Sequence, residues 1–309
     1  MTAASHGTNL LPANTTMGTV RLRVKDLKAV YDYYTRGVGL VELTSDLPGV
    51  HLGLGNQMLV TLEHDPSLRA PARTEAGLFH VAILFDTPQD LARSLIRGLT
   101  SYRNRYVGSG DHLVSQAFYF ADPEGNGVEL YIDRPRDQWQ WSNGEVAMDT
   151  LHIDPVEFIR QHLTDEQIAL AAETPADYAG TVGHVHLQVG DVATAQQFYV
   201  DALGFERTAG LGNAAVFVSA GGYHHHMAMN VWNSLGASPR QNTLGLGVVN
   251  LHLPGEGALD ALADRLKYKG IATTFDGQSL NFMDPWNNQL RAHSACCVAR
   301  DIEASVTSG

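Results

Sequence analysis

Residues 18–40 read GTVRLRVKDLKAVYDYYTRGVGL, and residues 183–205 read GHVHLQVGDVATAQQFYVDALGF. The two stretches repeat one another at a constant offset of 183 − 18 = 165 positions. Each alternates apolar and polar residues, as a half-buried strand does, and then changes to helical spacing. The shared Asp predicts a helix N-cap, and the shared Gly predicts the end of that helix. The matching pairs are Val20 and Val185, Leu22 and Leu187, Val24 and Val189, Asp26 and Asp191, Tyr34 and Tyr199, and Gly39 and Gly204.

A second pair of related stretches follows further along the chain. Residues 118–131 read FYFADPEGNGVELY and residues 280–293 read LNFMDPWNNQLRAH, at an offset of 162 (282 − 120 for the shared Phe). Each predicts a strand, a turn rich in Pro, Gly and Asn, and a final strand. A strand and a helix precede each stretch, over residues 79–99 and 248–269.

These repeats predict four βαβββ units, near residues 17–65, 78–134, 181–232 and 246–294. The expected fold is therefore α+β, with the four units forming two cupped mixed-sheet modules. Residues 17–134 and 181–294 each hold two units. Residues 135–180 are an expected connector with a helix in 154–173, where apolar residues recur at helical spacing. Residues 1–16 and 295–309 are expected tails.

Composition limits the classes of partner. The 309 residues suffice for two domains, and the formal net charge is 21 − 33 = −12. A negative field of this size repels nucleic acid and anionic lipid, so neither nucleic acid nor membrane is an expected partner. The two cysteines, Cys296 and Cys297, are adjacent and close no long loop. Residues 1–16 carry no pattern of a secretory signal, and a cytoplasmic location is the expectation.

Three strings carry a resemblance to a known family. They are SGDHLVSQAFYFADPEGNGVELYIDRP from residue 109, GHVHLQVGD from 183 and SAGGYHHHMAMNVW from 219. Together with the four units, they resemble the vicinal oxygen chelate superfamily, which includes glyoxalases, bleomycin resistance proteins and dioxygenases. Within it they are similar to the bacterial catechol 2,3-dioxygenase group of type I extradiol enzymes. The resemblance implies degradation of aromatic compounds, a small aromatic diol and O2 as substrates, and a homo-oligomer.

The resemblance also implies where metal ligands lie, at the start of a unit's first strand and on its last strand. Only His80, Glu129 and His184 are good ligands at these positions. Two His and one carboxylate form the facial triad of Fe(II) enzymes that activate O2, and Mn(II) shares these ligands. The three can meet only if the second unit pairs with the third and the first with the fourth. His186, on the same strand face as His184, competes for the ligand role. The other positions hold Thr19, Val249 and Arg291.

Further roles follow from the resemblance alone. Tyr119, ten residues before Glu129, matches a tyrosine that hydrogen-bonds the substrate, and His225, three residues before Ala228, matches a histidine that acts as acid and base. A strand through Tyr223–Met229 puts His224 and His226 on the face opposite His225, although a bulge would shift this phase.

For two further residues, two positions remain open. His112 lies seven residues before Tyr119, where the family has a histidine at nine, so it is either near the active site or a solvent-facing loop residue. Trp232 lines an aromatic substrate pocket or packs in the core.

Three functions remain distinct possibilities at this level. The favoured one is extradiol cleavage of catechol or a substituted catechol. A glyoxalase-type isomerase or lyase on the same fold usually presents extra Glu or Gln ligands and leaves fewer open positions. A non-catalytic small-molecule binding protein needs no ligand triad. Metal content separates the third from the first two, and O2 uptake with catechol separates the first from the second.

Overall fold

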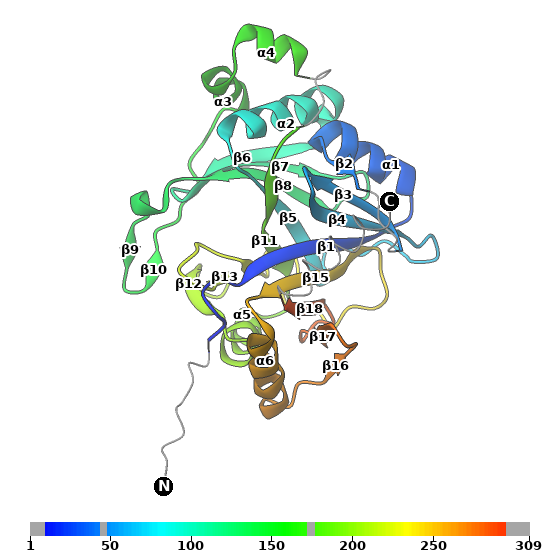
Figure 1. The fold of residues 1–309 in the computed structure, drawn as a ribbon, viewed down its shortest axis with the longest axis vertical. Coiled ribbons are helices and arrows are strands. Elements are labelled where there is room, and N and C mark those ends of the chain that lie inside the picture. The colour runs from blue at the N-terminus through cyan, green and yellow to red at the C-terminus, as the bar shows by residue number, and fades with distance from the viewer. Residues whose placement is uncertain (1–9, 44–47, 172–176, 295–309) are drawn as a thin grey trace.

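The computed structural model describes residues 10–43, 48–171 and 177–294, which form two eight-stranded mixed sheets with helices around them (Figure 1). The expected α+β class is confirmed. Residues 1–9 and 295–309, which include most of both expected tails and both cysteines, lie outside the described residues. Among the described helices, none has the length and apolar character that crossing a membrane requires.

Each sheet combines strands from two distant parts of the chain. The first sheet contains, in spatial order, β16 (Thr273–Phe275), β17 (Ser279–Met283), β18 (Gln289–Ser294), β15 (Gly245–Leu253), β1 (Thr16–Val24), β4 (Gln57–His64), β3 (Val50–Leu54) and β2 (Val41–Glu42). The second contains β12 (Glu206–Gly210), β13 (Ala215–Ser219), β14 (Met227–Asn230), β11 (Gly180–Gln188), β5 (Gly77–Phe85), β8 (Gly127–Asp133), β7 (Ser115–Ala121) and β6 (Tyr106–Asp111). The expected pairing of the second unit with the third, and of the first with the fourth, is therefore confirmed.

The strand directions place the three strands that carry the candidate ligands side by side. Within a unit the first strand runs parallel to the last, as β5 does to β8 and β11 to β14. Two units then join through their first strands, so β5 and β11 run antiparallel at the middle of the second sheet. Strands β8, β5 and β11 are therefore consecutive, and side chains on one face of them gather in one cup.

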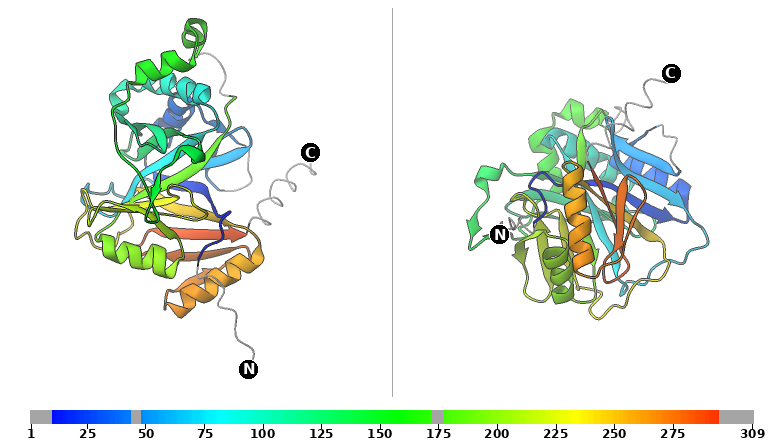
Figure 2. Two further views of the ribbon diagram at one scale, coloured as in Figure 1. Left: turned by 90° about the vertical axis from the view of Figure 1, so that its left-hand side faces the viewer. Right: turned by 60° about the horizontal axis from the view of Figure 1, so that its bottom comes forward.

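The helices lie at opposite ends of the molecule (Figures 1 and 2). Helices α1 (Leu27–Asp32) and α5 (Val192–Gln196) begin at the repeated aspartates, whose side chains accept a hydrogen bond from a first-turn backbone amide as predicted. Each continues as a π-helical turn that ends near a glycine in the left-handed conformation. The connector holds α3 (Pro155–His162) and α4 (Asp165–Leu170), so a helix there is confirmed, broken where Thr164 caps the second piece. The remaining helices are α2 (Pro88–Ser101) and α6 (Glu256–Tyr268), and a short hairpin joins β9 (Trp141–Ser142) to β10 (Glu145–Val146).

The main apolar core is shared by the two sheets. Val185 and Leu187 of β11 are fully buried in one cluster that also contains Val20 and Leu22 of β1. Because successive side chains on a strand point to opposite faces, the residues between them point away from this core. His184 accordingly lines a cavity on the other side of β11. The apolar side chains of β11 thus pack in the core, and the polar side chains that alternate with them face the cavity.

Candidate metal centre

Three strands each bring one ligand-competent side chain to the same point. His80 on β5, Glu129 on β8 and His184 on β11 are all buried. Glu129 Oε2 lies 2.9 Å from His80 Nε2 and 3.0 Å from His184 Nε2, and the two imidazole nitrogens are 3.3 Å apart. Within the described residues, these three form the group whose spacing suits a metal ion.

The distances fit one face of an octahedron. Ligand bonds of about 2.1 Å that meet at right angles hold neighbouring ligand atoms about 3 Å apart. The three observed separations match this value, and the set of two imidazoles and one carboxylate matches the facial triad of non-haem Fe(II) sites. The residues present therefore fit a divalent metal ion of this kind, while the geometry does not separate Fe from Mn.

The protonation states also suit a metal. Burial raises the pKa of Glu129, but the charges and hydrogen bonds of His184 and His80 outweigh it and hold that pKa well below its usual range. Burial lowers the pKa of His184 to about 4, against the opposing effect of Glu129. At neutral pH the carboxylate is therefore ionised and the His184 imidazole neutral, which are the forms that bind metal.

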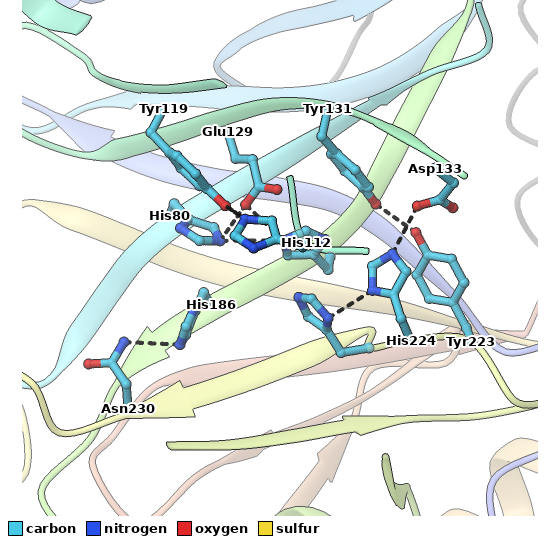
Figure 3. Close-up of polar contacts among 12 residues, drawn as sticks. His80, His112, Tyr119, Glu129, Tyr131, Asp133, His186, Tyr223, His224 and Asn230 are labelled. Carbon is cyan, nitrogen blue, oxygen red and sulfur yellow. Dashed lines mark hydrogen bonds and ion pairs between the residues drawn. The ribbon is translucent and has the colours of Figure 1, made fainter. Parts of the chain in front are cut away.

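Tyr119 and His112 lie beside this cluster. Tyr119 on β7 pairs directly with Glu129 across the β7–β8 ladder, and its hydroxyl is 2.6 Å from His112 Nε2. His112 Nδ1 is 2.8 Å from the backbone carbonyl of Asp149, which can only accept, so Nδ1 carries the proton and Nε2 accepts from the tyrosine hydroxyl. His112 thus contacts Tyr119 and lines the same cavity, with its ring partly exposed (Figure 3).

The predicted strand through Tyr223–Met229 is wrong for its first four residues, because β14 begins at Met227. Gly221 and Gly222 adopt positive φ values of 65° and 67° and turn the chain before it. The carbonyls of Tyr223 and His224 then accept hydrogen bonds from the hydroxyls of Ser219 and Thr208. Strand alternation therefore does not apply to the three histidines that follow.

His224 and His225 lie side by side as a result, rather than on opposite faces as expected. Their Nδ1 atoms are 2.8 Å apart. The His225 ring lines the cavity and lies 4.1 Å, centroid to centroid, from that of His184. His226 is held elsewhere, with its Nδ1 accepting a hydrogen bond from the Ala220 backbone amide.

His186 belongs to an aromatic wall instead of the ligand group. Its Nε2 is 3.0 Å from the side-chain amide of Asn230, which donates to it. Its ring, that of Phe79 and that of Trp232 pack edge to face, with centroids 5.0–5.3 Å apart. Trp232 is half exposed and lines the cavity, so of its two expected positions the pocket wall is the observed one.

A cavity of about 1250 Å³ joins these groups. Its walls include the three candidate ligands and the side chains of Tyr119, His112, His225 and Trp232. Residues 145–150, which comprise β10 and the segment after it, also line the cavity. Phe79 in the cavity wall, and Tyr131 and Asp133 beside the site, are not among the residues predicted above. Tyr131 and Asp133 could have been predicted, because they follow Glu129 at steps of two on one strand and so share its face.

Comparisons with known proteins place this chain in a family. A profile described as Glyoxalase/Bleomycin resistance protein/Dioxygenase superfamily matches residues 181–290. The catechol-2,3-dioxygenase of Bacillus subtilis (strain 168) is 35% identical over 285 residues, covering 88% of this chain and 94% of that protein. Among solved structures, glyoxalase I from Zea mays shares the fold with a TM-score of 0.58 at 15% identity, over 94% of this chain and 96% of that one. The cppA protein from Streptococcus pneumoniae TIGR4 has a TM-score of 0.55 at 11% identity, over 92% and 99%.

Proposed function

Because this chain belongs to the glyoxalase/bleomycin resistance/dioxygenase superfamily, we propose that it is an extradiol dioxygenase. It opens the ring of a catechol or a substituted catechol with O2, at Fe(II) held by His80, Glu129 and His184. The observation that carries this proposal is the convergence of the three ligand atoms beside a cavity that also contains Tyr119 and His225. The 35% identity to a catechol-2,3-dioxygenase supports the same reaction class.

When bound, the iron would supply open coordination positions where the diol and O2 meet, and a route for electrons between them. In the overall reaction, a ring bond beside a hydroxylated carbon breaks and both atoms of O2 enter the product. Holding the reactants together removes most of the entropic cost of their encounter.

The chain's own residues bind and orient the diol. Tyr119 is hydrogen-bonded to His112. Burial, together with the nearby Glu129, raises the pKa of its phenol well above the usual value. The phenol therefore stays protonated. Its single proton is donated to His112, so its oxygen lone pairs are available to accept a hydrogen bond from a substrate hydroxyl. His225 is proposed as the acid and base, supported by the position of its ring on the cavity wall beside His184.

The cavity favours a substituted catechol over catechol itself. Pockets of 300–1,000 Å³ hold drug-sized ligands, so about 1250 Å³ leaves much space beside a single ring. The Phe79, His186 and Trp232 rings offer an apolar aromatic wall for a substituent. Trp232→Ala should raise KM for aryl- or alkyl-substituted catechols and leave KM for catechol nearly unchanged.

The test of the function is O2 consumption. Anaerobic protein is loaded with Fe(II), or with Mn(II) in parallel, mixed with a panel of catechols and then exposed to O2. The proposal expects stoichiometric O2 uptake and a yellow ring-opened semialdehyde. A metal-replete protein that consumes no O2 with any catechol contradicts the proposal, and isomerase assays would then be the next measurement.

A further inference from the structure

A chain of hydrogen bonds leads from the end of β8 to the proposed acid–base residue. Asp133, four residues after Glu129 on the same strand face, has its Oδ1 2.9 Å from His224 Nε2. His224 Nδ1 in turn lies 2.8 Å from His225 Nδ1. Figure 3 draws the Asp133–His224 contact beside the Tyr131–Tyr223 hydroxyl pair, which is 2.8 Å apart.

The proton positions along this series of hydrogen bonds follow from the carboxylate of Asp133, at which the series begins. An ionised carboxylate only accepts hydrogen bonds, so His224 Nε2 carries a proton and donates it to Asp133. A neutral imidazole has one N–H, so Nδ1 of His224 is left as an acceptor. His225 must then donate from its own Nδ1, and its Nε2 is left with a free lone pair.

Packing and hydrogen bonds together fix the orientation of the middle ring. His224 is fully buried and packs against the ring of Tyr223 at 4.1 Å and that of Trp139 at 5.3 Å, centroid to centroid. Its carbonyl is also held, by the Thr208 hydroxyl. This packing holds the plane of the ring. A half-turn about the Cβ–Cγ bond keeps that plane but would place carbon atoms against Asp133 and His225, so the two hydrogen bonds fix which nitrogen faces each partner.

We propose that Asp133 and His224 are positioning residues, which hold His225 in the tautomer that leaves Nε2 unprotonated. The expected effect of this tautomer on turnover rests on the proposed function, because that function assigns the acid–base role to His225. Many enzymes use a carboxylate that accepts a hydrogen bond from one side of a catalytic histidine to fix its tautomer, since only one tautomer presents a lone pair to the reacting group. His224 itself does not line the cavity and acts through His225.

The tautomer can be measured without turnover. Nitrogen-15 NMR of the protein loaded with diamagnetic Zn(II) distinguishes protonated from unprotonated ring nitrogens in each histidine. His226 is an internal reference for the opposite tautomer, because its Nδ1 accepts from Ala220 and its Nε2 must carry the proton. The expected result is a proton on Nδ1 of His225 and none on its Nε2. A proton on Nε2 of His225 in the wild-type protein would overturn the proposal, whatever the protein does with catechol.

Variants test the dependence on Asp133. Asp133→Asn keeps the size of the side chain but offers an amide N–H to His224, and Asp133→Ala removes the acceptor, so both should release or invert the His225 tautomer. For each, kcat should fall on the order of 10–100-fold, while iron content and KM for catechol stay near the wild-type values. Asp137→Asn, at an exposed position four residues further on, removes the same charge and should change neither spectrum nor kcat.

The outcomes separate this proposal from the proposed function. An unchanged His225 tautomer in both Asp133 variants would refute the positioning role even if turnover fell. The expected tautomers in a protein that consumes no O2 with any catechol would instead refute the dioxygenase assignment and leave the hydrogen-bond chain standing.

Discussion

Gly183, the residue before the proposed ligand His184, should not tolerate alanine. A Cβ at this position would lie 1.7 Å from the Tyr131 hydroxyl and 2.7 Å from Cζ of the same ring. The ring cannot move aside easily, because Tyr131 is fully buried and its hydroxyl is hydrogen-bonded to Tyr223. Overpacking of this kind costs about 1–3 kcal/mol, so Gly183→Ala should lower the free energy of unfolding of the metal-free protein by that amount.

The same substitution should weaken metal binding. The Tyr131 ring packs 4.8 Å, centroid to centroid, from the ring of His184, so a shift of Tyr131 would displace the His184 imidazole. Metal affinity, measured by Zn(II) titration, should fall roughly 10–100-fold, as for other losses of support around a ligand. Gly108→Ala, on β6 of the same sheet with nothing within 4 Å of its added Cβ, is the control. Adding Tyr131→Phe removes the closest clash and should recover part of both losses. If the free energy of unfolding of Gly183→Ala lies within about 0.5 kcal/mol of wild type and its Zn(II) affinity is unchanged, the steric reasoning is wrong.

Three other changes have expected outcomes. Glu129→Ala should lose the bound metal. The control His186→Ala, which removes a histidine two residues from His184 on the same strand, should keep it. Metal analysis after gel filtration compares the two variants, and full metal retention by Glu129→Ala would contradict the proposed metal centre. Tyr119→Phe should keep iron yet turn over more slowly, with the loss in kcat rather than in metal content, and unchanged kcat would remove Tyr119 from the reaction. Burial raises the pKa of Asp122 to about 6 against the hydrogen bonds from Asn126, so the folded state binds its proton more tightly than the unfolded state does. The stabilisation from this proton is complete below about pH 4 and is lost as pH rises through 6, so the unfolding free energy of wild type relative to Asp122→Asn should fall by about 1–3 kcal/mol between pH 4 and pH 7 in urea titrations. A difference that is constant with pH would contradict the raised pKa.

Much of the architecture could be predicted from local sequence alone. The alternation in residues 18–24 and 183–189 defines two first strands, and Asp26 and Asp191 cap the helices that follow because a short carboxylate satisfies free amides at a helix start. The distribution of ligand-competent side chains also predicted which units pair. The observed pairing of β5 with β11 agrees with that inference, since a shared metal ion would require its ligand atoms to lie about 3 Å apart, whichever order the chain supplies them in.

The arrangement of the three consecutive histidines depended on tertiary structure. Sequence periodicity predicts a strand through His224 and His225, but two left-handed glycines and two hydroxyl groups from β12 and β13 hold this segment out of the ladder. These contacts come from residues up to 16 positions away, and no local pattern encodes them. The contact of Asp133 with His224, 91 positions apart, likewise exists only because β8, β5, β11 and β14 are consecutive in one sheet and His224 lies just before β14.

Local sequence was thus sufficient to predict most elements and their repeat, since propensity, capping and side-chain alternation act over a few residues, while the candidate ligands came from the family resemblance. The assembled sheets were needed to establish which nitrogens of His80 and His184 approach Glu129, how the neighbouring histidines are hydrogen-bonded, and how large a cavity lies beside them. Those properties depend on distances of a few tenths of an ångström between strands that are far apart in the chain, and such distances are set by the packing of the whole sheet.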